Sequence, residues 1–207
     1  MESDPDTQKI KTICESLVGS KIHFGFTITL PLGETQSGKI NNCNIIGDCM
    51  ENILFPFIKS EMPTFEEGPK QASPDFYNRK IFNFELKSFG GNGPGFDIGS
   101  ITGYIDSLSL EGGVEKKLFK TNYLVFEYGI ENEKCVLKKF WMLKVWDLCC
   151  GYGGAKPINI GGGKGVNIRP GTKNQWVSNN TKEKRNPTNF LDRIEKLIQS
   201  TWYKVDD

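Results

Sequence analysis

Residues 81–87, Ile-Phe-Asn-Phe-Glu-Leu-Lys, constrain the fold more than any other stretch of the sequence. Apolar and polar side chains alternate here with a period of two, which is the period of a β-strand. The two phenylalanines and Leu86 would point to one face of a sheet and enter a core. Glu85 and Lys87 would point to the opposite face. An acid and a base are therefore expected to project together from a strand whose other face is buried.

A second acidic residue, Asp75, opens the preceding predicted strand at residues 75–77. A turn at 78–80 would fold this strand back, so that Asp75 lies beside Glu85. Two neighbouring carboxylates repel each other, and burial raises that cost. A divalent cation makes the arrangement favourable, and Mg²⁺ prefers oxygen ligands. We expect Asp75 and Glu85, with the backbone carbonyl of Leu86 as a further oxygen, to bind Mg²⁺, for which Mn²⁺ would substitute.

These groups suit the hydrolysis of a phosphodiester. A bound cation acidifies a water molecule, and Lys87 could stabilise the hydroxide or orient the attacking water. The cation also offsets the charge that develops on the phosphate. Glu-x-Lys alone would more often be a surface ion pair, worth roughly 0–1 kcal/mol. Pro74-Asp75, with its acid ten residues before Glu85, favours the catalytic interpretation.

Pro74-Asp75 followed by Glu85-Leu86-Lys87 resembles the signature of the PD-(D/E)xK nuclease superfamily, and in particular of type II restriction endonucleases. The likeness is specific over about residues 47–105 and concerns only the order of elements elsewhere. It implies an α/β fold of the mixed α+β type, in which helices flank a central mixed β-sheet. It also implies a single nuclease domain over residues 1–207 that cleaves specific sequences in double-stranded DNA.

A homodimer is the expected assembly, because one active site cuts one strand and a two-fold dimer matches a palindromic target. A monomer that nicks the two strands in turn is the alternative. The resemblance further implies an auxiliary acid on the helix before the motif, predicted at 47–60. Glu51 stands at the matching position, and Asp48, one turn earlier, is its competitor.

Two Gly- and Asn-rich stretches are predicted loops that could approach a duplex closely. The first, Ser88–Ser107, leaves the catalytic strand directly, and the second, Tyr152–Asn180, is basic. Arg169 is the best candidate to contact a guanine, because its fork suits two acceptors. Asn159, Asn167, Asn174 and Gln175 could contact adenine. The predicted DNA-binding residues are Ser88, Asn92, Lys156, Lys164, Arg169, Lys173 and Asn174.

The charge distribution agrees with a DNA substrate. Residues 1–113 carry a net charge of −6 and residues 114–207 a net charge of +7. Within 156–185 seven basic residues accompany one acid, Glu183. Such a patch suits a phosphate backbone, although a solvated basic loop would have the same composition.

Other classes of protein are disfavoured. No apolar run approaches the roughly 20 residues of a membrane helix. Six cysteines without Cys-x-x-Cys spacing and a single histidine, His23, argue against zinc. Residues 161–165 lack the full phosphate-binding loop pattern, so no nucleotide cofactor is expected. The acidic N-terminus is unlike a secretory signal, and we expect a cytoplasmic protein with reduced, mostly buried thiols.

The remaining pattern supplies helices, strands and loops around the motif. Helices are predicted at 7–18, capped by Asp6, at 47–60, kinked or divided at Pro56, and from Pro187, capped by Asn186. Strands are predicted at 21–30, 75–77 and 80–87, and a hairpin at 122–130 and 135–146 turns at 131–134. Residues 33–44, 63–73, 88–113 and 149–180 are predicted loops and linkers.

Three alternatives to a restriction endonuclease stay open at this point. A repair or mismatch-nicking nuclease of the same fold would share the metal site and differ in its target. A DNA-binding protein that has lost cleavage would need no metal, although both acids and the lysine are present here. An unrelated β-rich binding protein would carry the motif by chance.

Overall fold

The computed structural model describes residues 4–22, 25–29, 31, 33, 35–39, 43–69, 73–79, 81–91, 94–132, 134–149, 159–161 and 167–202. Contacts divide the chain into two units, which are described separately. Unit 1 comprises residues 1–92 and 124–142, and unit 2 comprises residues 93–123 and 143–207. A helix of the length and hydropathy needed to cross a membrane does not occur in the described ranges.

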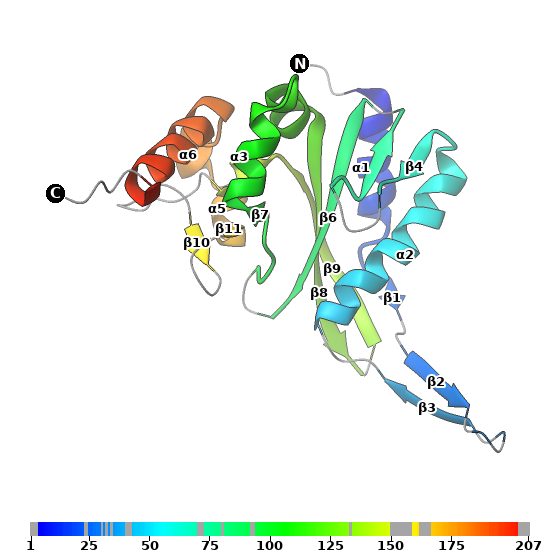
Figure 1. Cartoon of the computed structure of the whole chain (residues 1–207). Coiled ribbons are helices and arrows are strands. Elements are labelled where there is room, and N and C mark those ends of the chain that lie inside the picture. The colour runs from blue at the N-terminus through cyan, green and yellow to red at the C-terminus, as the bar shows by residue number, and fades with distance from the viewer. Residues whose placement is uncertain are drawn as a thin grey trace. The chain divides into compact units, whose positions relative to one another are not determined.

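Unit 1 is built on a sheet whose described strands follow the order β1-β9-β8-β6-β5-β4 (Figure 1). These strands are β1 (Lys21–Ile22), β4 (Phe65–Glu67), β5 (Phe76–Asn78), β6 (Phe82–Gly90), β8 (Thr121–Glu131) and β9 (Lys134–Leu143). β5 pairs with both β4 and β6 in antiparallel register. A separate antiparallel hairpin consists of β2 (Gly25–Thr29) and β3 (Thr35–Lys39).

Two helices, α1 (Pro5–Ser16) and α2 (Cys43–Glu61), share one core with this sheet. The most deeply buried members of the core include Ile10, Cys14, Met50, Leu54, Ile58, Phe65, Phe84, Leu124 and Phe126. Both helices therefore cover the same sheet face.

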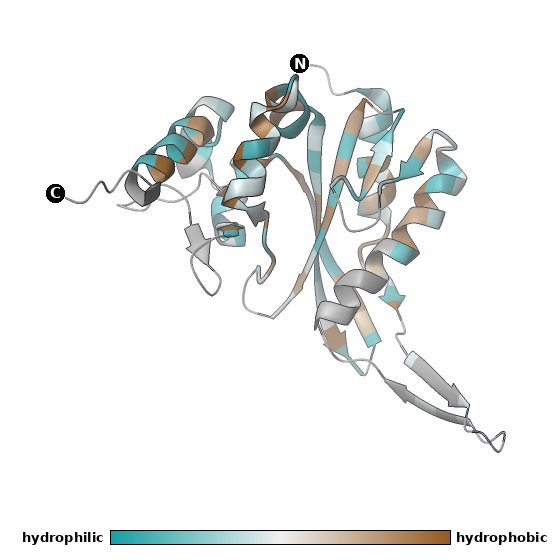
Figure 2. Ribbon diagram, in the orientation of Figure 1, coloured by the Kyte–Doolittle hydropathy of each residue, from teal (hydrophilic) through white to brown (hydrophobic). Residues whose placement is uncertain are grey.

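Alternation along β6 decides what the other sheet face carries. Phe84 and Leu86 belong to the helix-covered core. Glu85 and Lys87, at the intervening positions, project to the opposite face. Figure 2 shows hydrophobic and hydrophilic positions following one another along the strands. The prediction that Phe84 and Leu86 enter the core is confirmed, and Glu85 between them is buried as well.

A cluster of phenylalanine rings fixes the β5–β6 hairpin against α2. Phe65 and Phe76 have ring centroids 5.3 Å apart, and Phe55 stacks on Phe76 at 5.8 Å. Phe84 lies 5.8 Å from Phe65. Each fully buried ring contributes roughly 1.5–3 kcal/mol. The cluster therefore holds together the strands from which Asp75 and Glu85 come.

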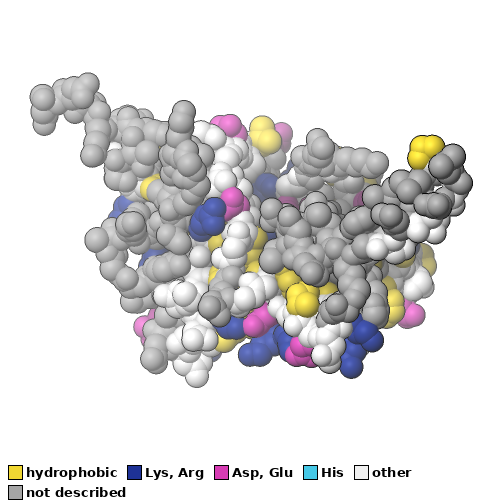
Figure 3. Space-filling view, turned by 90° about the horizontal axis from the view of Figure 1, so that it is seen from below, with side chains coloured by type: hydrophobic (Ala, Val, Ile, Leu, Met, Phe, Trp, Pro, Cys, Tyr) yellow, Lys and Arg dark blue, Asp and Glu magenta, His cyan; other side chains and the backbone are white. Residues whose placement is uncertain are grey.

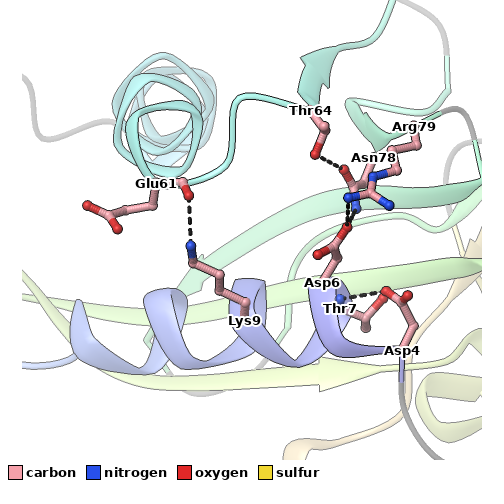
Figure 4. A network of polar contacts seen from close by, with 8 residues as sticks. All are labelled: Asp4, Asp6, Thr7, Lys9, Glu61, Thr64, Asn78 and Arg79. Atoms are coloured by element: carbon pink, nitrogen blue, oxygen red, sulfur yellow. Dashed lines mark hydrogen bonds and ion pairs between the residues drawn. The ribbon is translucent and has the colours of Figure 1, made fainter.

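The turn between β5 and β6 is tied to the start of α1 (Figure 4). Asn78 is 2% exposed, accepts a hydrogen bond from Thr64 Oγ1 at 2.8 Å and donates one to Asp6 Oδ2 at 2.9 Å. Arg79 adopts a φ of 51° in the turn, and its guanidinium lies 3.4 Å from Asp6. These contacts join α1, β4 and the hairpin at one point.

The prediction that Asp6 caps α1 is wrong. Asp4 is the cap, because its Oδ2 accepts a hydrogen bond from Thr7 N–H at 2.8 Å. Pro5 then occupies the first helical turn, where its missing N–H costs nothing. Asp6 is thereby released to bind Asn78.

Unit 2 contains a small sheet in the order β10-β11-β7, formed by β7 (Gly99–Ser100), β10 (Asn159–Gly161) and β11 (Asn167–Arg169). Its described helices are α3 (Ile101–Ser109), the π-helix η1 (Glu115–Lys120), α4 (Val145–Cys149), α5 (Lys173–Val177), the 3₁₀-helix η2 (Asn179–Lys184) and α6 (Pro187–Trp202). Buried Trp176 packs against Phe96, and Phe190 meets Tyr104 edge to face. Ile168 of β11 is fully buried.

A half-buried ion pair holds α4, α5 and η2 together. Arg185 Nη1 lies 3.2 Å from Asp147 Oδ1, and the guanidinium also donates to the carbonyls of Trp176 and Ser178. Burial raises the pKa of Asp147, and Arg185 opposes that shift. Arg185 was counted in the basic stretch predicted for phosphate, but it serves this internal network.

Lys144 is anchored beside the same ion pair. Its ammonium donates to the carbonyls of Phe119 at 2.6 Å and Thr121 at 3.1 Å. Burial lowers the pKa of Lys144 to about 8, against the attraction of Asp147. Lys144 thus satisfies two backbone carbonyls at the end of η1, although burial of its ammonium group costs some desolvation.

Two of the predicted periodic elements are confirmed, although the second strand of the hairpin ends at Leu143 and Val145 already begins α4. The single strand predicted at 21–30 is wrong, because β1 and β2 belong to different sheets. The hairpin of β8 and β9 turns at residues 131–134, and Asn186 caps α6 by accepting a hydrogen bond from Asn189 N–H at 2.9 Å. The α+β class is confirmed. Cys14, Cys135 and Cys149 are buried, as predicted for most of the cysteines.

Several predicted loops contain regular structure instead. Residues 33–44 and 63–73 include β3 and β4, and residues 149–180 include β10, β11 and α5. Residues 88–113 include the end of β6, β7 and α3, so Ser88–Ser107 is not a continuous loop. α2 runs unbroken through Pro56, and the predicted division there is wrong. These segments were predicted as loops from their glycine and proline content, and the short apolar patterns of their strands and helices were missed.

Replacing Asn78 with Ala should destabilise unit 1. The change removes a buried amide that satisfies both Thr64 and Asp6. We expect the free energy of unfolding in urea to fall by about 1–3 kcal/mol. Lys11→Ala, which breaks only an exposed pair with Glu15, is the control and should shift stability by less than about 0.5 kcal/mol. Equal losses in the two variants would contradict the importance of this network.

Candidate active site

Asp75 immediately precedes β5, at the end where the antiparallel register carries it toward Glu85. Phe76 pairs with Phe84, so the next position of the ladder sets Asp75 across from Glu85. Asp75 Oδ2 accepts a hydrogen bond from the backbone N–H of Leu86 at 2.6 Å. Two acidic residues that are ten positions apart in the sequence are therefore neighbours at one end of the hairpin.

Glu85 is buried despite its charge. The residue is 8% exposed, and its Oε2 lies 3.8 Å from the ammonium of Lys87, whose side chain is 22% exposed. Both side chains leave the same face of β6. A shielded carboxylate is costly unless positive charge lies near it. The ammonium of Lys87 supplies one such charge.

A glycine in the loop before β5 fixes the backbone of Asp75. Gly68 N–H donates to the carbonyl of Asp75 at 2.7 Å. A Cβ atom at position 68 would meet the carbonyl oxygen of Pro74 at 1.7 Å, which no side chain can tolerate. Sequence reasoning assigned no role to Gly68. Only the Gly-Pro turn signal at 68–69 could have drawn attention to it.

The donor set at this end of the hairpin fits a hard divalent cation. Within a strand, the N–H and C=O of one residue point toward the same neighbour. Because the N–H of Leu86 points to Asp75, the carbonyl oxygen of Leu86 is directed to the same edge of β6. No group of three or more His, Cys, Asp and Glu side chains suited to a metal occurs among the described residues. Two carboxylates and a carbonyl suit Mg²⁺, which retains several waters, better than zinc.

The auxiliary acid is predicted on the helix before the motif. Glu51 lies within α2, but its side chain, like that of Asp48, is outside the described residues. Its neighbours Met50 and Leu54 are buried in the core of unit 1.

The predicted DNA-binding residues have different surroundings. Asn92, Lys156 and Lys164 lie outside the described residues. Ser88 lies within β6, where alternation places it on the helix-covered face with Leu86. Lys173 and Asn174 begin α5, and Asn174 is exposed.

β11 pairs with β7 and so joins the two stretches predicted as DNA-facing loops. Arg169 Nε lies 3.0 Å from Asp97 Oδ1, and Asn167 Nδ2 donates to Asp97 Oδ2 at 2.8 Å. Gln175 is another predicted base contact. Its side-chain oxygen accepts a hydrogen bond from the backbone N–H of Thr172, the N-cap residue of α5.

One face of the molecule can be followed in Figure 3. Lys and Arg side chains there are interspersed with Asp and Glu side chains among the described residues.

Two comparisons with known proteins bear on the family and the fold of this chain. The family model of the NgoBV restriction endonuclease matches residues 12–207. The chain belongs to this restriction endonuclease family. The solved NlaIV restriction endonuclease has a similar fold, with a TM-score of 0.72 and 22% sequence identity over 93% of this chain and 79% of that chain. No curated protein matches the sequence.

This endonuclease is therefore specific for sequences in double-stranded DNA, as the Pro74-Asp75 and Glu85-x-Lys87 pattern indicated. Family membership favours a restriction endonuclease over a repair nuclease and over an unrelated β-rich binding protein. The fold likeness confirms the predicted central sheet flanked by helices.

Gly68→Ala should impair the endonuclease without replacing any polar group. The added methyl group displaces the carbonyl of Pro74 and with it the backbone of Asp75. Displacement by about 1 Å can cost on the order of 100-fold in rate, and we expect at least about a tenfold loss of cleavage. Gly95→Ala is the matched control, because its Cβ would enter open space. Cleavage by Gly68→Ala at the rate of Gly95→Ala would show that the Asp75 backbone tolerates the change.

Proposed function

We propose that this endonuclease hydrolyses phosphodiester bonds at Asp75, Glu85 and Lys87 with Mg²⁺ as its cofactor. The supporting observation is the hydrogen bond of 2.6 Å from Leu86 N–H to Asp75 Oδ2, in a register that sets Asp75 beside Glu85. The ammonium of Lys87 lies 3.8 Å from Glu85 on the same strand face. Mn²⁺ should substitute, because it accepts the same oxygen ligands.

Asp75, Glu85 and the carbonyl of Leu86 would hold the cation. When bound, it would offset charge on the scissile phosphate and acidify water. Lys87 orients the attacking water and stabilises negative charge in the transition state. The N–H of Leu86 restricts the Asp75 carboxylate, so that less conformational entropy is lost when ligands assemble. The family resemblance supports Glu51 as an auxiliary acid.

DNA contact is proposed for the residues singled out by the sequence. Arg169 and Asn174 have exposed surface on β11 and α5, which is compatible with a bound duplex. Phosphate contacts would position the duplex and base contacts would select the sequence. The proposed contacts are Asn92, Lys156, Lys164, Arg169, Lys173 and Asn174, and Ser88 is left out because alternation places it on the helix-covered face of β6.

A homodimer built from single nuclease domains would match a palindromic target. The family match over residues 12–207 supports one domain that includes both units. A cytoplasmic location is proposed because the free thiols of Cys14 and Cys135 suit a reducing compartment.

Digestion of a sequenced plasmid tests the catalytic proposal. With Mg²⁺ or Mn²⁺, discrete fragments with a shared end sequence are expected, and a chelator should stop cleavage. Glu85→Gln and Lys87→Ala should each lower the cleavage rate by at least about 100-fold, because they remove a ligand and a stabilising charge. DNA binding should be retained.

Glu66→Gln is the matched control for this experiment. Glu66 is a carboxylate of the same sheet, exposed on β4 and bonded to Tyr77 at 3.1 Å. Its replacement should leave cleavage within about twofold of the wild type. Retained cleavage in Lys87→Ala, or cleavage unaffected by the chelator, would refute the proposed mechanism.

A further inference from the structure

Asp97 contacts two polar side chains that share one face of β11. Its Oδ2 accepts a hydrogen bond from Asn167 Nδ2 at 2.8 Å, and its Oδ1 lies 3.0 Å from Arg169 Nε. Asn167 and Arg169 are two positions apart, so strand geometry directs them to the same side. Ile168, between them, is fully buried. A single carboxylate thus engages both polar residues of this short strand.

The backbone next to Asp97 is itself held on β11. Ile98 N–H donates to the carbonyl of Ile168 at 2.9 Å, and Gly99 pairs with Ile168 in the β7–β11 ladder. The carboxylate is therefore attached to a main chain that is hydrogen-bonded to the strand it contacts. Its position relative to Asn167 and Arg169 follows from that pairing.

Burial within the pair is uneven. Arg169 Nε and Asp97 Oδ1 are both shielded from solvent, whereas each whole side chain is 34% exposed. The exposed surface of Arg169 therefore belongs to atoms of the side chain other than Nε. Nε and Oδ1 are at contact distance without hydrogen-bond alignment, so the attraction is chiefly electrostatic.

The charge of Asp97 separates two uses of Arg169. A residue that only binds phosphate would be weakened by a carboxylate beside it, because both the carboxylate and the phosphate are negative. A residue that recognises a base edge gains from a fixed orientation, because two hydrogen bonds to guanine require an aligned fork. The observed pair suits the second use.

We propose that Asp97 is a positioning residue for sequence recognition, which holds the Arg169 fork and the Asn167 amide toward base edges of the target DNA. This inference rests on the proposed contact of Arg169 with DNA. Asp97 acts through its two partners and touches neither the base nor the scissile phosphate.

Asp97→Asn tests the inference. The asparagine keeps an oxygen for Asn167 and removes the charge that faces Arg169. The measurement is the ratio of kcat/KM on the target to kcat/KM on sites with one altered base pair. We expect this ratio to fall by about tenfold, within the range of one bidentate base contact. Affinity for unrelated DNA should stay equal or rise, because one negative charge is lost.

The double variant Asp97→Asn/Arg169→Ala distinguishes positioning from a general loss of structure. If Asp97 acts through Arg169, the double variant discriminates between sites as Arg169→Ala does alone. Additive losses would contradict this. Asp106→Asn, an exposed carboxylate on α3 in the same unit, is the matched control and should leave the ratio unchanged. If Asp97→Asn fails to fold, Asp97→Glu, which displaces the carboxylate by one methylene, should still lower the ratio.

The outcomes separate this inference from the proposed function. An unchanged ratio in Asp97→Asn, with a lowered ratio in Arg169→Ala, overturns the role of Asp97 alone. An unchanged ratio in Arg169→Ala overturns both the guanine contact and the positioning role. Unspecific degradation by the wild type would instead refute site-specific cleavage itself.

Discussion

The antiparallel register between β5 and β6 is the constraint on which the candidate site depends. Phe76 opposite Phe84 sets Asp75 beside Glu85 and directs the N–H of Leu86 to the Asp75 carboxylate. A slip of one residue would turn the acids into the helix-covered core and the phenylalanines out of it. The same rings that make the slip costly, packed under α2, are therefore what keep two like charges together.

Backbone packing supports this register from outside the two strands. At Gly68 only a hydrogen atom fits beside Pro74, and its N–H fixes the carbonyl of Asp75. At the opposite end of the hairpin, Asn78 joins the turn to Thr64 and to Asp6 of α1. The polar end of the hairpin is thus preorganised by residues that never approach a substrate, which is what electrostatic catalysis requires.

The sequence predicted the parts of this arrangement that local pattern specifies. Alternation gave the two faces of β6, and the motif spacing located Asp75 relative to Glu85. It missed the role of Gly68 because a close backbone approach leaves no periodic signal. It also missed α3 and the link from Asp97 to Arg169, because 72 positions separate these two residues in the sequence and the pairing of β7 with β11 brings them together. The capping residue of α1 was also missed, because Asp4 and Asp6 are both suitable acids near the start of the helix and Asp4 is the one that accepts the hydrogen bond.

A crystal grown with Mn²⁺ would test the central claim most directly through the anomalous scattering of the metal. We expect a peak about 2.1 Å from carboxylate oxygens of both Asp75 and Glu85 and from the carbonyl oxygen of Leu86. Its disappearance in crystals of Glu85→Gln would agree with that assignment. A metal bound elsewhere in the protein, with Asp75 and Glu85 unligated, would contradict it.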